Sequence, residues 1–419
     1  MTKYLIFTYE ICNLGGGQLY VQRRAKYLTE KGFDVRVVVF FHDPSYFPLE
    51  NDFSGIPFYV IPEMGRTSSC LTNSKVNNII GDLLNMLGKN DDIYIESHTL
   101  TLIEWGELVA MRCQAKHLAY PLAEPIISNY FFNPGKKIFS YKLINNQFYG
   151  CTSVSLKQIF GKTNVPSNYV NIGFKASELN ERCFPQIPYD KNNSDFVIST
   201  VGRLEKQYIE PLIEACIKFS DFFPNQHIVL IIGGGSKIQG REEYLKRIYG
   251  NLNKNLEVIF TGYIERLGKD IFNMSDVFVG MGTASLNAIS QGCLTINVDP
   301  NNEMKFASGF FGIDTNNFAY SESGKVFDIS EKLKEAYLMN PEKRQMIILK
   351  AKTLFDIQYE ENACFSKLDD VISSIEIAHN KSILHVSFCY RISVIILFSF
   401  YKFLKKTYLW QLTKLLYKK

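Results

Sequence analysis

Short runs of consecutive apolar residues, each followed by a helical pattern, recur through most of the chain. Two clear runs are residues 35–41 and 227–232, which read VRVVVFF and HIVLII. Strands that are apolar at nearly every position, rather than at alternate positions, are typical of a parallel sheet covered by helices on both faces. This repeated strand–helix pattern predicts an α/β, doubly wound fold.

The repeat is interrupted at residues 185–195 by a segment rich in proline and asparagine, PQIPYDKNNSD. A segment of this composition without an apolar period indicates a domain boundary. A chain of 419 residues has room for two or three domains. We predict two Rossmann-like domains in tandem over residues 1–185 and 195–360, followed by a closing helix at 361–380 and a tail at 381–419.

The tail has an uneven charge distribution. After Glu376 the chain holds eight Lys and Arg residues and no acidic residue, so this end carries +8 and the rest −4 of a net +4. Aromatic residues such as Phe398 and Trp410 are interspersed with these cations. The tail lacks the roughly 18 consecutive apolar residues of a spanning helix, so we expect an amphipathic segment on an anionic membrane surface. A packed terminal helix or a disordered tail is the alternative.

Composition argues against several classes of protein. A mildly acidic body does not favour nucleic-acid binding. The nine cysteines are scattered without a C-x-x-C pair or a zinc spacing, so we expect neither a disulfide framework nor a structural metal. The first residues enter an amphipathic strand directly, without the pattern of a secretory signal. We therefore expect a cytoplasmic protein, peripheral at the inner face of the membrane.

A glycine loop follows the first predicted strand. The loop includes Gly16 and Gly17 and precedes a helix predicted over residues 18–31. Because glycine has no side chain, backbone N–H groups in such a loop can come close to a phosphate or a sugar. A plain tight turn is the alternative interpretation.

The stretch 276–299 reads strand, turn, helix, strand. Gly280 and Gly282 form the turn, and Thr283 or Ser285 is expected to cap the helix. A helix that begins just after a strand directs its N–H groups and positive dipole end toward the carboxyl edge of the sheet, which favours phosphate binding. The alternative is a structural crossover in which the glycines serve only tight packing.

Charged or titratable residues stand at the ends of two other predicted strands. Arg203 and Lys206 follow the strand at 196–201, where two cations can neutralise a diphosphate. His98 stands at the carboxyl end of the strand at 92–96, the edge at which doubly wound folds bind ligands. The alternatives are a solvated turn for the two cations and a structural role for the histidine.

The order of these motifs resembles family 4 of the glycosyltransferases, which have the GT-B fold. The resemblance extends over about residues 1–370 and includes the glycine loop and the apolar strand of the first half. In the second half it rests on Val201–Leu204 with Lys206, Ile231–Gly235, Phe260–Gly262, Ser275–Val279 and Ala288–Gly292.

The resemblance implies two Rossmann-like domains that face each other across a cleft, with the acceptor on the first and the donor on the second. It also implies a retaining transfer from a nucleotide-diphosphate sugar, such as a UDP- or GDP-sugar, without a metal or another cofactor. The absence of an Asp-x-Asp motif from the sequence agrees with this implication.

The resemblance further implies roles for individual residues. Arg203 and Lys206 would stabilise the leaving diphosphate by electrostatic interaction. His98 would orient or polarise the transferred sugar or the acceptor. The expected binding positions are Gly16, Gly17, Gly202, Gly234, Gly282, Thr283, Ser285 and Asn287.

One pair of positions departs from the family pattern. The family usually has Glu-x7-Glu, whose second glutamate holds the ribose hydroxyls, and the two positions here are Val279 and Asn287. The short Gly-Met-Gly-Thr turn resembles that of a subgroup of the family. An asparagine side chain can hydrogen-bond a ribose hydroxyl, but without a charge.

Two functions from different classes follow. The first is a sugar transferase that extends a lipid-linked surface polysaccharide, with a lipid-linked oligosaccharide as acceptor and the tail on the membrane. The second is a non-catalytic GT-B-like binding or scaffold subunit of the same assembly, with Asn287 marking a lost donor site. A GT-B epimerase acting on UDP-sugars is a third hypothesis. Such an enzyme would need more carboxylates at the cleft than the sequence places there.

Overall fold

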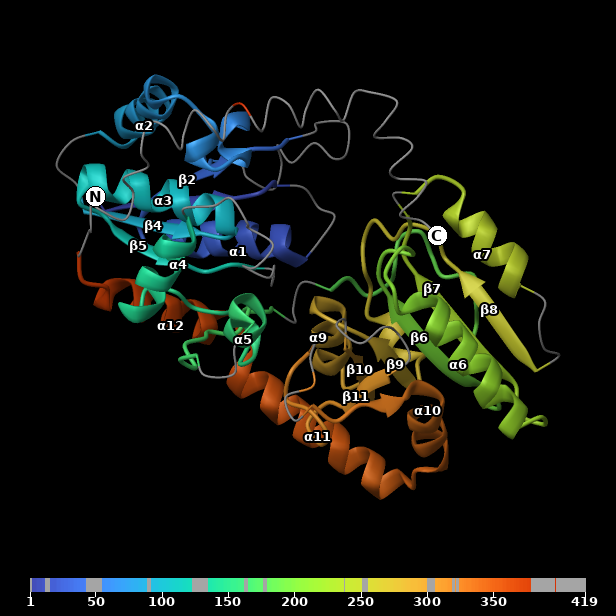
Figure 1. Cartoon of the computed structure of the whole chain (residues 1–419). Coiled ribbons are helices and arrows are strands. Elements are labelled where there is room, and N and C mark those ends of the chain that lie inside the picture. The colour runs from blue at the N-terminus through green and yellow to red at the C-terminus, as the bar shows by residue number, and fades with distance from the viewer. Residues whose placement is uncertain are drawn as a thin grey trace. The chain divides into compact units, whose positions relative to one another are not determined.

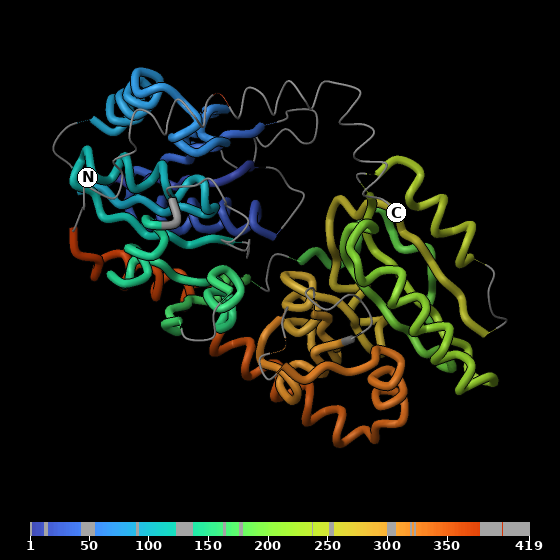
Figure 2. The backbone as a smooth tube through the Cα atoms, viewed as in Figure 1, coloured from blue at the N-terminus to red at the C-terminus, as the bar shows by residue number. Residues whose placement is uncertain are grey.

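The computed structural model contains two compact units, each with its own sheet (Figures 1 and 2). Unit 1 comprises Met1–Asn171 and Phe365–Lys419, and unit 2 comprises Ile172–Cys364. The prediction of two Rossmann-like α/β domains is confirmed. The structure describes residues 2–11, 16–42, 55–88, 92–122, 135–161, 165–175, 179–236, 238–250, 255–299, 306–318, 321, 324–377 and 396.

Unit 1 has a five-stranded parallel sheet in the order β3-β2-β1-β4-β5. Phe7 of the central strand β1 pairs with Val38 of β2 on one side and with Ser97 of β4 on the other. The strand order therefore reverses direction between β1 and β4. The strands are β1 (Lys3–Thr8), β2 (Asp34–Val39), β3 (Phe58–Val60), β4 (Ile93–Ser97) and β5 (Lys116–Ala119).

Two helices of unit 1 begin where the local sequence supplies a threonine cap. Thr72 accepts a hydrogen bond from the Lys75 amide at the start of α2, and Thr99 accepts one from the Leu102 amide at the start of α3. Two short 3-10 helices at Pro62–Gly65 and Ser68–Cys70 precede α2. The α-helices are α1 (Gly16–Glu30), α2 (Asn73–Leu87), α3 (Leu100–Cys113), α4 (Gly135–Ile144) and α5 (Ser155–Phe160).

The last helix of the body, α12 (Glu361–Ser374), contributes its residues from Phe365 onward to unit 1. Phe365, Leu368 and Ile372 are buried. The Gln147 amide donates to the Glu376 carbonyl at 3.1 Å, just beyond the helix. These contacts make the end of the described body an integral part of unit 1.

Unit 2 has a seven-stranded sheet in the order β12-β11-β10-β9-β6-β7-β8. Strands β6 to β10 are parallel, whereas β11 and β12 extend the sheet in antiparallel fashion. All residues of β7 are buried, as its uninterrupted apolar run predicts. The strands are β6 (Phe196–Val201), β7 (Ile228–Gly233), β8 (Leu256–Phe260), β9 (Val277–Gly280), β10 (Thr295–Val298), β11 (Phe306–Phe310) and β12 (Phe327–Asp328).

Strand order in unit 2 reverses direction between β6 and β9, since β7 and β8 continue on one side of β6 and β10 continues beyond β9. The core of one face includes Ile198, Leu212, Leu230 and Ile296. The helices of unit 2 are α6 (Ile209–Phe222), α7 (Arg241–Tyr249), α8 (Asp270–Asn273), α9 (Thr283–Ser290), α10 (Ile329–Leu338) and α11 (Pro341–Gln358).

A hydrogen-bonded polar network lies inside unit 1. The Ser97 hydroxyl is 3.0 Å from Nε2 of His117, and Nδ1 of His117 is 2.9 Å from Glu107. Lys142 forms an ion pair with Glu107 and donates to the His117 carbonyl at 3.1 Å. The order serine–histidine–glutamate is that of a hydrolase triad, but all four residues are buried. The network is therefore structural, because the backbone of α3 at Gly106 packs directly on the serine and the histidine.

Gly106 of α3 provides the space for this network. A Cβ atom at residue 106 would lie 2.4 Å from both the Ser97 hydroxyl and Nε2 of His117. Gly81 of α2 is the opposite case, since a Cβ atom there would meet nothing within 4 Å.

These two helical glycines give a matched stability test. We expect Gly106→Ala to lower the free energy of unfolding by about 1–3 kcal/mol, because the new methyl group overpacks a buried network. We expect Gly81→Ala to raise the same quantity by about 0.5–1 kcal/mol through helix propensity. Differential scanning calorimetry measures both midpoints. Equal midpoints for the two variants would contradict the packing assigned to Gly106.

Candidate functional site

The ends of β6 and β9 form the candidate site of unit 2. The two strands are neighbours, with Ser199 paired to Phe278. Gly202 follows β6, and Gly282 follows β9 after one intervening residue. Doubly wound sheets bind ligands at the carboxyl edge where the strand order reverses, and this edge lies at that point of unit 2.

Glycines bring the backbones of three strand ends close together here. The Gly202 amide donates to the Gly233 carbonyl at 2.8 Å, and the Gly234 amide donates to the Gly262 carbonyl at 3.0 Å. Gly234 has a φ of +134°, and a Cβ atom on it would lie 2.3 Å from the Gly202 carbonyl oxygen. Only glycine fits position 234, so this edge presents bare backbone to a ligand.

Arg203 and Lys206 lie at the same edge. The Lys206 ammonium is 3.2 Å from the Cβ position of Gly202, so the side chain folds back over the Gly202 backbone. The Arg203 side chain is about half exposed, and its ion-pair partner among the described residues is Glu205, 3.7 Å away. An exposed pair at this distance is worth little energy, so the guanidinium stays available to an anion. Among the described residues, Lys206 has no carboxylate partner within salt-bridge distance.

The helix α9 follows β9 at the same edge. Its observed N-cap differs from the predicted one. Its N-cap is Gly282, with a φ of +71° and no side-chain cap hydrogen bond. Ser285 is fully buried, and its hydroxyl has no hydrogen-bond partner within the described part of the chain. Neither Thr283 nor Ser285 caps the helix, because the first one lies inside the helix and the second one faces the core. The uncapped N–H groups of the first turn suit an anion.

Asn287 lies one turn further along α9. Thr283 and Asn287 are four positions apart and both half-buried, whereas Leu286 and Ala288 are buried in the core. The first two side chains therefore share the outer face of the helix. The structure thus brings Gly202, Arg203, Lys206 and Gly234 to one edge of unit 2, together with the start of α9.

In unit 1 the corresponding edge lies at the ends of β1 and β4. The His98 amide donates to the Phe7 carbonyl at 2.9 Å, so His98 directly follows β4 at the point where the strand order reverses. The Leu122 amide donates to the His98 carbonyl at 3.1 Å, and the Cβ position of Gly17 lies 3.8 Å from the Leu122 side chain. His98 and the start of α1 at Gly16 and Gly17 therefore meet around Leu122. The earlier part of the glycine loop, residues 12–15, lies outside the described residues.

The sequence reading missed the carboxylate next to His98. Glu96 is fully buried in β4, and its side chain is 2.8 Å from Nε2 of His98. Arg24 of α1 lies 3.3 Å from the same carboxylate and is also fully buried. The sequence does contain one signal for this carboxylate, a glutamate inside a strand that is expected to be buried. A buried carboxylate needs hydrogen-bonding partners.

Comparisons with known proteins identify the family of unit 2 and the fold of the whole chain. Residues 186–353 match the family described as Glycosyl transferases group 1. A glycosyltransferase from Rickettsia africae ESF-5 is similar over 92% of this chain and 100% of its own, with 14% identity and a TM-score of 0.66. Anabaena Alr3699/HepE, solved in complex with UDP-glucose, is similar over 89% of this chain and 100% of its own, with 15% identity and a TM-score of 0.58.

The protein is a GT-B glycosyltransferase with a glycosyl transferases group 1 domain. This confirms the resemblance to group 1 glycosyltransferases of the GT-B fold, and the subgroup with the short turn stays a prediction. A third solved structure, WaaG, a glycosyltransferase involved in lipopolysaccharide biosynthesis, is similar to this glycosyltransferase over 88% of the chain and 100% of its own length. The identity with WaaG is 14% and the TM-score is 0.53. None of the curated protein sequences compared with the glycosyltransferase matches it.

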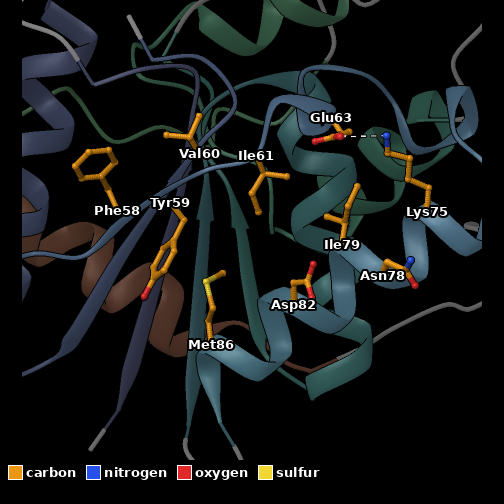
Figure 3. Close-up of a pocket in the computed structure, with 10 residues that line it drawn as sticks. All are labelled: Phe58, Tyr59, Val60, Ile61, Glu63, Lys75, Asn78, Ile79, Asp82 and Met86. Atoms are coloured by element: carbon orange, nitrogen blue, oxygen red, sulfur yellow. Dashed lines mark ion pairs between the residues drawn. The ribbon is translucent and has the colours of Figure 1, made fainter. Parts of the chain in front are cut away.

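A hollow of about 650 Å³ lies elsewhere on unit 1 of the glycosyltransferase, between β3 and α2 (Figure 3). Glu63 and Lys75 form an ion pair at 3.1 Å on its border. No predicted site residue lines it. The lining residues are Phe58, Tyr59, Val60, Ile61, Glu63, Lys75, Asn78, Ile79, Asp82 and Met86.

Neither a metal-binding cluster nor a membrane-spanning helix is present among the described residues of the glycosyltransferase. No three His, Cys, Asp or Glu side chains in this part of the chain gather as the ligands of a metal ion would. None of its described helices combines the length and the apolar character that crossing a membrane requires.

Proposed function

We propose that the glycosyltransferase moves a sugar from a nucleotide-diphosphate sugar, such as a UDP- or GDP-sugar, to a lipid-linked or surface-polysaccharide acceptor. The observation that carries the proposal is the convergence of Arg203, Lys206 and the uncapped start of α9 on the β6/β9 edge. The complex of HepE with UDP-glucose and the role of WaaG in lipopolysaccharide biosynthesis support the choice of donor and acceptor.

The proposed reaction breaks the bond between the sugar and the diphosphate, so negative charge develops on the leaving phosphate. Arg203 would bind phosphate oxygens in bidentate fashion, and Lys206 would act as a point charge. The N–H groups at Thr283 and Ala284 would add their dipoles, since that of Gly282 already donates to the Phe318 carbonyl at 2.9 Å. Fixed donors of this kind supply the charge stabilisation that a metal ion supplies in other enzymes, and we propose a metal-independent transfer with retention.

The remaining predicted residues have proposed roles in binding. Gly202 and Gly234 would allow the donor to approach the backbone. Asn287 would hydrogen-bond a ribose hydroxyl from the outer face of α9, with Ser285 supporting that helix from the core side. In unit 1, Gly16 and Gly17 would leave room for a sugar or phosphate, and His98 would orient the transferred sugar or the acceptor hydroxyl.

A non-catalytic GT-B-like subunit is the second candidate, and the observation that favours it is the uncharged Asn287 at the proposed ribose position. Such a subunit would bind a nucleotide sugar weakly and would not consume it. The presence of both cations at the β6/β9 edge favours the enzyme, because they would stabilise a leaving diphosphate.

Two cation variants test the donor site. We expect Arg203→Ala and Lys206→Ala each to weaken the binding of the nucleotide sugar by about 10-fold or more, since each removes a charge-assisted hydrogen bond. Isothermal titration with UDP-, GDP- and ADP-glucose measures the affinity. Lys246→Ala is the matched control, because Lys246 is an exposed cation of unit 2 whose partner is Glu242 on the same helix.

The same titration separates the two candidate functions. A wild-type protein that binds none of the three nucleotide sugars, or that binds one equally well after Arg203→Ala, would contradict the donor site. Tight binding without any release of nucleoside diphosphate would support the non-catalytic subunit.

The tail has a separate test. We propose that residues 381–419 hold the protein at an anionic membrane surface, because basic residues near such a surface contribute about 1 kcal/mol each. In flotation with phosphatidylglycerol vesicles we expect the full chain to float and a chain ending at residue 380 to remain in solution. A variant with Lys402, Lys405 and Lys406 changed to Gln should float less than the full chain. Equal flotation of all three proteins would remove the membrane role of the tail.

A further inference from the structure

Glu96 of β4 is surrounded by polar side chains. Its carboxylate is fully buried and receives hydrogen bonds at both oxygens. Oε1 accepts from the Tyr20 hydroxyl at 3.0 Å and lies 2.8 Å from Nε2 of His98. Oε2 accepts from the Tyr4 hydroxyl at 2.6 Å and from Nε of Arg24 at 3.3 Å.

Arg24 is held in turn by the end of the body. Its guanidinium donates to the Phe365 carbonyl at 3.2 Å and forms an ion pair with Asp369 at 2.8 Å. Asp369 alone could neutralise this guanidinium, so the burial of a second carboxylate, Glu96, is not needed to balance the charge of Arg24. Two tyrosine hydroxyls and one histidine nitrogen are nevertheless directed at Glu96.

The protonation of Glu96 decides the protonation of Nε2 in His98. Burial by itself would raise the pKa of Glu96, but the Arg24 charge and the hydrogen bonds from His98 and Tyr4 lower it to about 2. An ionised carboxylate can only accept hydrogen bonds. Nε2 of His98 must therefore carry the hydrogen, and in the neutral ring the lone pair is on Nδ1.

Nδ1 of His98 is buried, and no hydrogen-bond partner for it exists within the described part of the chain. The ring lies against two aromatic side chains, Tyr20 with centroids 5.4 Å apart and Tyr120 with centroids 6.4 Å apart. Neither contact is a hydrogen bond to Nδ1. A buried polar atom without a partner is rare in proteins and requires an explanation. A hydroxyl group of a sugar bound at the β1/β4 edge would supply the missing hydrogen bond.

We infer that Glu96 is a positioning residue that holds His98 in the Nε2–H tautomer, so that Nδ1 is free to accept a hydrogen bond from a sugar or acceptor hydroxyl. The inference rests on the role proposed for His98 in transfer. Glu96 itself does not touch the substrate and acts only through the imidazole. Arg24, Tyr4 and Tyr20 keep the carboxylate ionised and fixed in place.

Glu96→Gln tests this inference, because the amide has nearly the shape of the carboxylate and can donate a hydrogen bond to Nε2. In ¹⁵N–¹H spectra of full-length protein labelled at histidine, we expect the hydrogen of His98 on Nε2 in the wild type and on Nδ1 in the variant. Comparison with His98→Gln assigns the signals. As donor we use the nucleoside-diphosphate glucose that binds in the titration. For the variant we also expect kcat for release of the nucleoside diphosphate to fall by about 10²–10⁴-fold, with KM changed less than about 2-fold.

Two further variants separate positioning from simple structural damage. Glu104→Gln is the matched control, because Glu104 is also buried in unit 1 but hydrogen-bonds Ser68 rather than a histidine. It should leave the tautomer of His98 and kcat unchanged. The double variant Glu96→Gln/His98→Gln should be no slower than His98→Gln alone, since Glu96 acts only through the ring.

Each result of this experiment has a defined meaning. Hydrogen on Nδ1 of His98 in the wild type would overturn the inference, whatever the activity. A tautomer that changes in Glu96→Gln without a fall in kcat would also overturn it. A wild-type protein that binds no nucleotide sugar would instead refute the proposed function. The spectra would still report whether Glu96 sets the tautomer of His98.

Discussion

The reversal of strand order in each sheet is the constraint on which the rest of the structure depends. Parallel strands buried on both faces can expose polar groups only at their ends. In unit 1 the reversal places the end of β1 beside the end of β4, and in unit 2 it places the end of β6 beside that of β9. Of the predicted site residues, His98 lies at the edge of unit 1, and Gly202, Arg203 and Gly282 lie at that of unit 2. Ser285 instead faces the core.

The two edges solve the problem of charge in different ways. In unit 2 the cations Arg203 and Lys206 stay partly exposed and weakly paired, which suits a ligand that brings its own negative charge. In unit 1 the charges of Arg24 and Glu96 are fully buried and paired with each other. Such a pair does not attract a charged ligand, but it fixes the geometry and protonation of the neighbouring His98. An anionic donor on unit 2 and a neutral hydroxyl next to His98 fit this difference.

The sequence was sufficient to predict the doubly wound architecture and which residues follow the strands. Uninterrupted apolar runs such as β7, and glycines directly after strands, determine both features through local rules. It was not sufficient for contacts between residues far apart in the chain. The partners of Glu96 come from β1 and α1, and those of His117 come from β4, α3 and α4, so only the folded chain brings them together. The cap of α9 was predicted wrongly because a serine in the first turn can equally face the core, as Ser285 does.

The central claim is that the β6/β9 edge of unit 2 binds the diphosphate of the donor. A crystal structure of the glycosyltransferase with bound UDP tests it most directly. The account predicts that phosphate oxygens contact Arg203, Lys206 and the backbone N–H groups at the start of α9, with the ribose near Asn287. UDP bound with its diphosphate away from α9, for example in the hollow between β3 and α2, would contradict the claim.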